Sequence, residues 1–248
     1  MAIKTLVAFV VLTFFSVQTH AQLSNYLKNA KKKLNTDYGT GKKGSSLTQS
    51  EISDGLRQAL QVGAKNATGK VSIANGFFGD ALIKVLMPPE AKKVEKTLRE
   101  IGMGRYVDDA VLSMNRAAED ASAKAFDIFV TAIKSMSIQD AVSILNGGND
   151  AATQYLKAKT TAQLTSSFRP VIQQSLEKVN ATKYWAMVFN TYNQLPTTFN
   201  KVNPDLPAYV TERALNGVFV YIAKEEAKIR KDPAAQVTDL LKKVFGGK

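Results

Sequence analysis

The chain has 248 residues, a formal net charge of +12 at pH 7, no cysteine and a single histidine, His20. The absence of cysteine excludes disulfides, thiolate catalysis and sulfur-ligated metal sites. Because His20 lies in an amino-terminal segment that we expect to be removed, Ser-His-Asp or Cys-His catalysis and imidazole-ligated zinc or copper are excluded as well.

Residues 1–21 have the pattern of a signal peptide. An uncharged apolar run from Leu6 to Val17 follows Lys4, and Ala21 offers a cleavage site. The run is shorter than the roughly 20 apolar residues of a transmembrane helix, which leaves an uncleaved anchor as the alternative. We therefore expect export through a cleavable signal peptide to the periplasm. Since no cysteine follows the run, the chain is not expected to be a lipoprotein.

Residues 22–46 are basic. Leu23, Leu27 and Leu34 recur at helical spacing among lysines and predict a short amphipathic helix, and the Gly-, Ser- and Lys-rich residues after it predict a flexible linker. Weak contact of residues 22–44 with an anionic membrane surface is one hypothesis. Nucleic acid is not an expected partner, because the aromatic residues lie away from the basic ends of the chain.

Residues 47–248 predict a single all-α domain, a multi-helix bundle without a convincing strand. Helix starts are marked by capping residues, namely Thr48 with Glu51, Ser137 with Asp140, and Asp205 with Pro207. About ten helices are predicted; they cover residues 22–35, 90–101, 105–121, 123–135, 161–179, 181–193 and 233–245 and also begin near 51, 137, 150 and 205.

Three local features complete the predicted fold. Residues 81–88 form one possible short extended segment, because Pro88 and Pro89 disfavour helix in the residue before each. Ser122 is the predicted cap between two helices. The aromatic side chains are expected to fill the core: Phe77, Phe78, Tyr184, Trp185, Phe189, Tyr192, Phe219 and Tyr221.

The densest polar segment, residues 105–121, supplies the first candidate binding residues. On a helix its apolar residues share one face, and two exposed i,i+4 ion pairs are predicted opposite, Arg105 with Asp109 and Arg116 with Asp120. A flank between these faces carries Asp108, Asn115 and Glu119, where polar side chains can meet a neighbouring element. We interpret the segment as a mainly structural helix, with this flank and Arg116 as its candidate site.

Two further features supply the other candidates. Arg169 precedes Pro170 inside a predicted helix, and its guanidinium is placed to cap the carbonyl that loses its partner. Glu212 and Arg213 lie early in the long final helix among apolar residues. A buried cluster of this kind is usually a structural cross-link and sometimes a ligand site. No catalytic residue, cofactor or metal site is predicted.

Several motifs in order resemble one bacterial family, the domain-of-unknown-function family 4197. They are NGFFGDALIKVLMP, SMNRAAEDA, ILNGGNDAATQYL, SFRPVI and YVTERALNGVFVYIAKEEAKIR, within Leu47 to Gly246. The resemblance implies an exported, helical, single-domain protein with no established activity. It also implies that Asn115, Arg116 and Glu119 correspond to the polar motif of the family, and residues 146–148 to its NGG turn.

The leading functional hypothesis is a non-enzymatic envelope protein that binds a protein partner or a small ligand through a groove of the helical bundle. One alternative is a carboxylate-dependent hydrolase of envelope glycans, using two acids from Asp108, Glu119 and Glu212. Another is attachment to a polyanion or a membrane surface through the basic ends of the chain. Whether the chain is an enzyme is left open, with the missing catalytic spacing against it.

Overall fold

The computed structural model describes residues 48–194 and 201–231. All of these residues belong to one compact unit, Leu47–Lys248, and the second unit, Met1–Ser46, lies outside them. The predicted signal peptide, the basic helix with its linker, and the last predicted helix at 233–245 therefore also lie outside the described residues.

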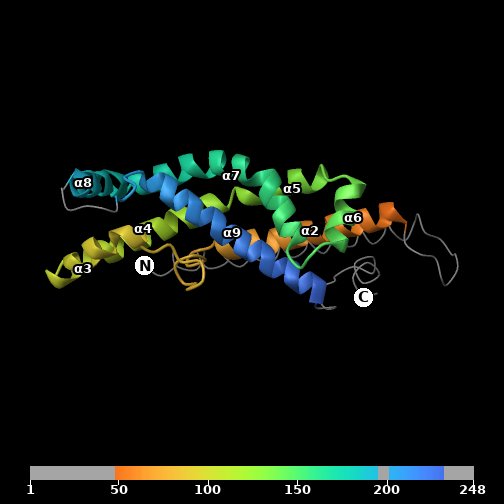
Figure 1. The fold of residues 1–248 in the computed structure, drawn as a ribbon, viewed down its shortest axis with the longest axis horizontal. Helices are drawn as coiled ribbons and strands as arrows, with labels where there is room; N and C mark the ends of the chain where they lie inside the picture. The colour runs from red at the N-terminus through yellow and green to blue at the C-terminus, as the bar shows by residue number, and fades with distance from the viewer. Residues whose placement is uncertain (1–47, 195–200, 232–248) are drawn as a thin grey trace, which may run out of the picture. The chain divides into compact units, whose positions relative to one another are not determined.

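The described residues form an all-α structure with no β-strand, as predicted (Figure 1). The helices are α2 (Gln49–Val71), the 3-10 helix η1 (Pro89–Ala91), α3 (Lys92–Glu100), α4 (Gly104–Ser122), α5 (Ala125–Lys134), α6 (Ile138–Asn146), α7 (Ala151–Glu177), α8 (Ala181–Gln194) and α9 (Leu206–Lys231). Residues 81–83 form a turn, and residues 84–88 have no regular secondary structure.

The prediction of about ten helices is wrong for this part of the chain. Two helices were expected to meet near residue 160, but α7 runs through this point without a break. A buried stripe at four-residue intervals, Leu156, Thr160, Leu164 and Phe168, holds the helix to its neighbours there. The Thr160 hydroxyl donates to the Leu156 carbonyl at 2.7 Å, so even the polar member of the stripe is satisfied within the helix.

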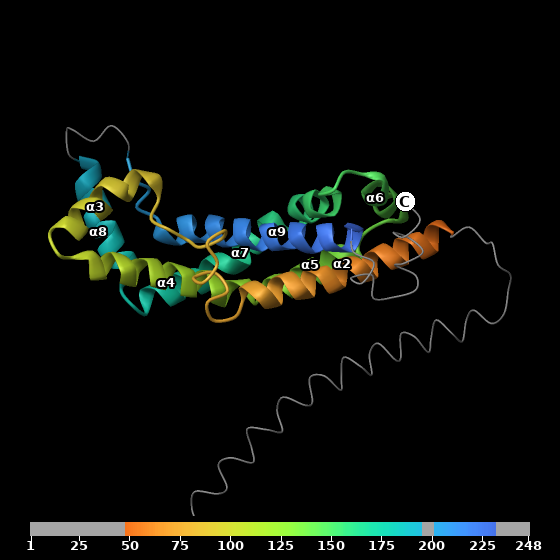
Figure 2. The same cartoon turned by 90° about the horizontal axis from the view of Figure 1, so that it is seen from below.

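Helix α9 is the centre of the arrangement, since it packs against α2, α4, α7 and α8. Figures 1 and 2 place α3 and α8 together at one end of the bundle and α6 at the other. In the core, the rings of Phe129 from α5 and Phe219 from α9 meet edge to face at 5.8 Å.

Within the described ranges, no single helix is long and apolar enough to cross a membrane. Only the pair Gly104–Lys134 and Ile138–Asn146, bent by 106° between its two parts, has the required length and composition.

The capping boxes are confirmed. Thr48 Oγ1 accepts the Glu51 N–H at 3.2 Å and opens α2, and Ser137 Oγ accepts the Asp140 N–H at 3.0 Å and opens α6. Ser122 is not a cap: its hydroxyl donates to the Ala118 carbonyl at 2.7 Å inside α4. A serine hydroxyl that bonds back to its own helix is no longer available to the next helix.

The prediction that the aromatic residues fill the core is correct with one clear exception. Tyr184 on α8 is 58% exposed. Its neighbour Trp185 is only 6% exposed. Phe78 and Tyr192 are half-buried, and the remaining members of the predicted set are buried: Phe77, Trp185, Phe189, Phe219 and Tyr221.

Candidate functional site

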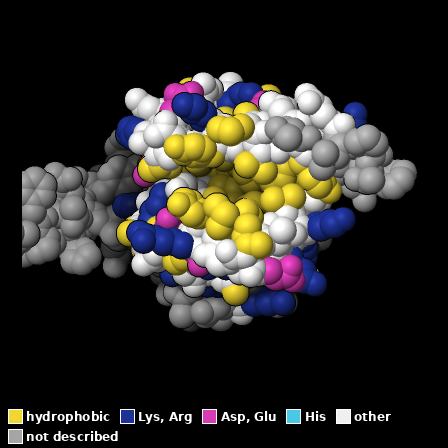
Figure 3. Space-filling model, turned by 90° about the vertical axis from the view of Figure 1, so that its left-hand side faces the viewer, with side chains coloured by type: hydrophobic (Ala, Val, Ile, Leu, Met, Phe, Trp, Pro, Cys, Tyr) yellow, Lys and Arg dark blue, Asp and Glu magenta, His cyan; other side chains and the backbone are white. Residues whose placement is uncertain are grey.

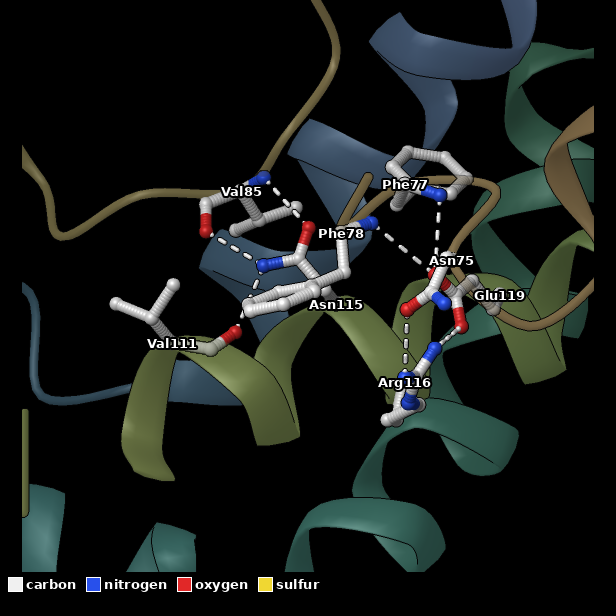
Figure 4. Close-up of polar contacts among 8 residues, drawn as sticks. All are labelled: Asn75, Phe77, Phe78, Val85, Val111, Asn115, Arg116 and Glu119. Atoms are coloured by element: carbon white, nitrogen blue, oxygen red, sulfur yellow. Dashed lines mark hydrogen bonds and ion pairs between the residues drawn. The ribbon is translucent and has the colours of Figure 1, made fainter. Parts of the chain in front are cut away.

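Asn115 in α4 fixes the irregular segment before η1 (Figure 4). Its side-chain oxygen accepts the Val85 N–H at 2.8 Å, and its amide nitrogen donates to the Val85 carbonyl at 2.8 Å and to the Val111 carbonyl at 2.7 Å. The side chain therefore pairs with Val85 as a neighbouring strand would. Asn115 is fully buried, so these bonds satisfy backbone groups that would otherwise lose water without compensation.

Glu119, one turn later, holds the loop after α2 in the same way. Its Oε1 accepts the N–H groups of Phe77 at 3.0 Å and Phe78 at 3.1 Å, and its Oε2 accepts Arg116 Nη1 at 2.6 Å. Arg116 also donates to the side-chain oxygen of Asn75 at 2.8 Å. The carboxylate is 3% exposed and fully engaged (Figure 4), so the motif predicted as a polar flank ties α4 to residues 75–85.

The predicted ion pair between Arg116 and Asp120 is therefore wrong. Arg116 turns to Glu119, and Asp120 instead accepts the Ser175 hydroxyl at 2.8 Å. A buried carboxylate attracts a guanidinium more strongly than an exposed one does, because water screens it less. The other predicted pair is present, with Arg105 Nε 3.8 Å from Asp109 Oδ2.

The remaining predicted site residues are not brought to the same place by any contact in the structure. Asp108 is exposed and accepts Arg99 Nη2 at 2.8 Å. Arg169 donates to Asp205 Oδ2 at 2.6 Å, so it joins α7 to the start of α9 instead of capping a carbonyl of its own helix. Glu212 and Arg213 are exposed, which corrects the expectation of a buried cluster, and Arg213 lies 5.3 Å from the ring centroid of Tyr209.

Glu226 is a structural residue that sequence reasoning missed. From α9 it accepts the N–H groups of Ala152 at 3.0 Å and Thr153 at 2.9 Å, and also the Thr153 hydroxyl at 2.7 Å. Arg230 bridges this carboxylate, at 3.0 Å, to the Ile144 carbonyl at the end of α6, at 2.9 Å. A carboxylate at a helix amino terminus is favoured by the helix dipole, and here it comes from another helix.

A cleft of about 510 Å³ between α3, α4 and α8 could hold a ligand. This volume falls in the range of about 300 to 1,000 Å³ that is usual for small-molecule sites. Figure 3 views this end of the molecule and shows hydrophobic side chains gathered around a hollow. The lining residues are Met87, Val94, Leu98, Tyr106, Val107, Asp109, Ala110, Leu112, Ser113, Met114, Val179, Ala181, Tyr184, Trp185, Val188, Phe189 and Leu206.

The lining offers few polar groups. Only Asp109 and Ser113 are neither apolar nor aromatic, and both have partners: the Ser113 hydroxyl donates to the Asp109 carbonyl at 2.8 Å, and the Asp109 carboxylate pairs with Arg105. The indole N–H of Trp185 donates to the Asn203 carbonyl at 3.1 Å, so this donor is already engaged within the protein. The cleft is thus built to surround hydrocarbon and has little capacity to recognise a polar ligand.

The pKa values of Asp80, Tyr209 and Tyr221 are shifted, and none of these residues lines the cleft. The Tyr221 hydroxyl donates a hydrogen bond to the Asp80 carboxylate, which lowers the pKa of Asp80 and raises the pKa of Tyr221 to about 12. Burial raises the pKa of Tyr209 on α9, whose hydroxyl donates to the Leu86 carbonyl at 2.8 Å. Both tyrosines bind the loop before η1 to α9, so these shifts belong to structural contacts.

Among residues 48–194 and 201–231, no group of three His, Cys, Asp or Glu side chains is placed to hold a metal ion. The acids considered for a hydrolase also do not meet in the cleft, because Asp108, Glu119 and Glu212 are absent from its lining.

Sequence motifs could not predict the cleft itself. Its walls come from residues far apart in the chain whose individual patterns are those of ordinary amphipathic helices.

Comparison with known proteins gives one match. A family model described as "Protein of unknown function (DUF4197)" matches residues 46–246, which includes the whole helical unit described above. No curated protein and no solved structure matches the chain. With most of its length covered by this model, the chain belongs to the DUF4197 family.

Proposed function

We propose that this protein is a non-enzymatic binding protein of the bacterial envelope and that it holds an apolar ligand, such as a fatty acyl chain, in the cleft between α3, α4 and α8. The observation that carries the proposal is the cleft of about 510 Å³ with its mainly apolar lining. The signal-peptide pattern of residues 1–21 supports a location in the envelope, with the periplasm as the expected compartment.

The walls of the cleft leave hydrophobic side chains in contact with solvent. Tyr184 is 58% exposed, Tyr106 68% and Val188 43%, although all three line the cleft. A bound hydrocarbon would remove part of this surface from water, at a gain of about 25 cal/mol for each Å² buried. Since Ser113 and Asp109 are both engaged by partners within the protein, specificity would come mainly from size and shape.

Trp185 makes the proposal directly testable, because it is the only tryptophan in the chain and it lines the cleft. Titration with monomeric hexadecanoate should shift the tryptophan emission to shorter wavelength and saturate at one ligand per protein. A substitution that fills the cleft, Ala110→Phe, should weaken binding at least about tenfold, which is about 1.4 kcal/mol.

The matched control is Ala162→Phe, which adds the same ring to an exposed position of α7 outside the cleft. This variant should bind hexadecanoate like the unaltered protein. An emission that stays constant during the titration, or equal weakening in both variants, would count against the cleft as a ligand site.

A further inference from the structure

The mouth of the cleft lies in a concentrated apolar surface. Eleven large hydrophobic side chains are exposed in the part of the chain that the structure describes, and seven of them come from the α3–α4 turn, the first turn of α4, the residue Val179 before α8, and α8 itself. We name these seven the apolar rim: Ile101, Met103, Tyr106, Val179, Tyr184, Met187 and Val188. Figure 3 shows hydrophobic side chains around the hollow on this face.

The apolar rim and the cleft are one continuous surface, because four of the rim residues also line the cleft. Helix α3 borders the same opening and contains no buried residue. Its apolar side chains Val94 and Leu98 are only half-buried and line the cleft. A contiguous exposed apolar surface marks a contact with another apolar phase or molecule.

We propose that the apolar rim docks on the surface of a lipid bilayer, with the cleft opening onto the acyl chains, so that a chain passes between bilayer and cleft without crossing water. This rests on the proposed function, because it gives the apolar ligand its source. Most of the cleft lining is apolar, and molecules that suit such a site are held in the bilayer and not in free solution.

Two properties of the rim favour lipid as the occupant. Tyr106 and Tyr184 each place an aromatic ring with a polar tip at the mouth, and such rings favour the boundary between hydrocarbon and water. The charges beside them nearly balance, since residues 90–109 contain five Lys or Arg and five Asp or Glu, and residues 177–194 contain two Lys and one Glu. Docking here would depend on burial of apolar side chains and not on attraction to anionic lipid, so added salt should not abolish it.

The test is flotation of the whole protein with neutral phosphatidylcholine vesicles in low and high salt. The paired substitution Ile101→Ser with Met187→Ser alters two rim residues, 63% and 54% exposed, that do not line the cleft. The matched control is Ile73→Ser with Leu82→Ser, two residues of the loop after α2 that are 54% and 63% exposed. The rim variant should lose vesicle binding at least about tenfold, and the control should keep it.

The proposal is overturned if the unaltered protein does not float with neutral vesicles, if it floats only with anionic vesicles and is released by salt, or if both paired variants lose binding equally. The Trp185 titration with monomeric hexadecanoate is run on the same variants. Normal hexadecanoate binding without vesicle binding would leave the cleft a ligand site and reject membrane docking. Absence of hexadecanoate binding would reject the proposed function itself.

Discussion

Glu226 in α9 accepts the backbone N–H of Ala152 at 3.0 Å, so the amino terminus of α7 is capped by a side chain 74 residues away in the chain. Local sequence offers no substitute. Asp150, at the cap position of α7, accepts the side-chain amide of Gln154 at 3.0 Å but makes no capping hydrogen bond to a backbone N–H of the helix. The start of a helix of 27 residues is thus determined by its contact with α9 and by Arg230, which locks the capping carboxylate in place.

The first prediction concerns this cap. Glu226→Ala should lower the free energy of unfolding by about 3 to 5 kcal/mol, because two backbone N–H groups lose their acceptor and Arg230 loses its carboxylate, keeping only the Ile144 carbonyl. Glu226→Gln should cost less, since an amide oxygen still accepts these bonds. Urea unfolding followed by circular dichroism measures both, with Glu212→Ala at an exposed position as the control, expected within about 0.5 kcal/mol of the unaltered protein. A Glu226→Ala loss no larger than the control would contradict the assignment.

The second prediction separates a structural role from a binding role for the polar motif of α4. Glu119→Ala should destabilise the protein by about 3 kcal/mol or more, because the N–H groups of Phe77 and Phe78 and the Arg116 guanidinium lose their partner. Arg116→Ala, at a half-buried side chain, should cost about 1 kcal/mol and leave a folded protein. Hexadecanoate binding to folded Arg116→Ala should be unchanged in the Trp185 titration; a tenfold loss there would make this motif part of the ligand site.

The third prediction compares two Gly→Ala substitutions that should change the free energy of unfolding in opposite directions. A Cβ at Gly217 would lie 2.4 Å from the Phe77 ring, so Gly217→Ala should destabilise by about 1 to 3 kcal/mol. A Cβ at Gly69, inside α2, would meet nothing within 4 Å, so Gly69→Ala should stabilise by about 0.5 to 1 kcal/mol through helix propensity. Thermal unfolding checks both, and Phe77→Leu combined with Gly217→Ala should recover part of the loss. Equal shifts for the two alanine variants would refute the packing argument.

The sequence predicts the fold wherever the signal is local. The capping boxes at Thr48 and Ser137 are correct, because each joins residues only three positions apart. Helical periodicity also predicts the class and most helix positions. The continuation of α7 past residue 160 was missed, because it depends on packing against neighbouring helices rather than on residues nearby in the chain.

The burial of the candidate site residues also depends on contacts between distant parts of the chain, which the local sequence does not predict. Asn115 and Glu119 were identified as polar residues beside an apolar face, but their burial depends on residues 75–85 folding over α4, which no helical pattern contains. The cleft escaped detection entirely, since Tyr106 and Tyr184 become neighbours of one opening only when α4 and α8 are placed in space. Tyr184 was expected in the core because side-chain type alone does not distinguish a buried ring from one at a cleft mouth.

The last prediction concerns pH and the contact between Arg169 in α7 and Asp205 before α9. Burial acts to raise the pKa of Asp205, but hydrogen bonds from Arg169 and from the Ala208 N–H outweigh it, and the pKa lies below its usual value. A carboxyl whose pKa is lower in the folded state adds stability that is fully present above the unfolded pKa of about 3.9 and is lost as pH falls through the folded value. Its contribution should therefore be constant from pH 7 to about 5 and decline below about pH 4.

Asp205→Asn tests this sign, because an asparagine oxygen can still accept the Ala208 N–H while the ion pair with Arg169 is lost. Urea midpoints of the two proteins should differ at pH 7 and converge as pH falls below about 4, where the native carboxyl becomes protonated too. The difference will be modest, since both side chains are more than a third exposed and water screens the pair. A gap between the two midpoints that stays the same from pH 7 to pH 3 would show that Asp205 contributes through its cap alone and that the charge pair with Arg169 adds nothing to stability.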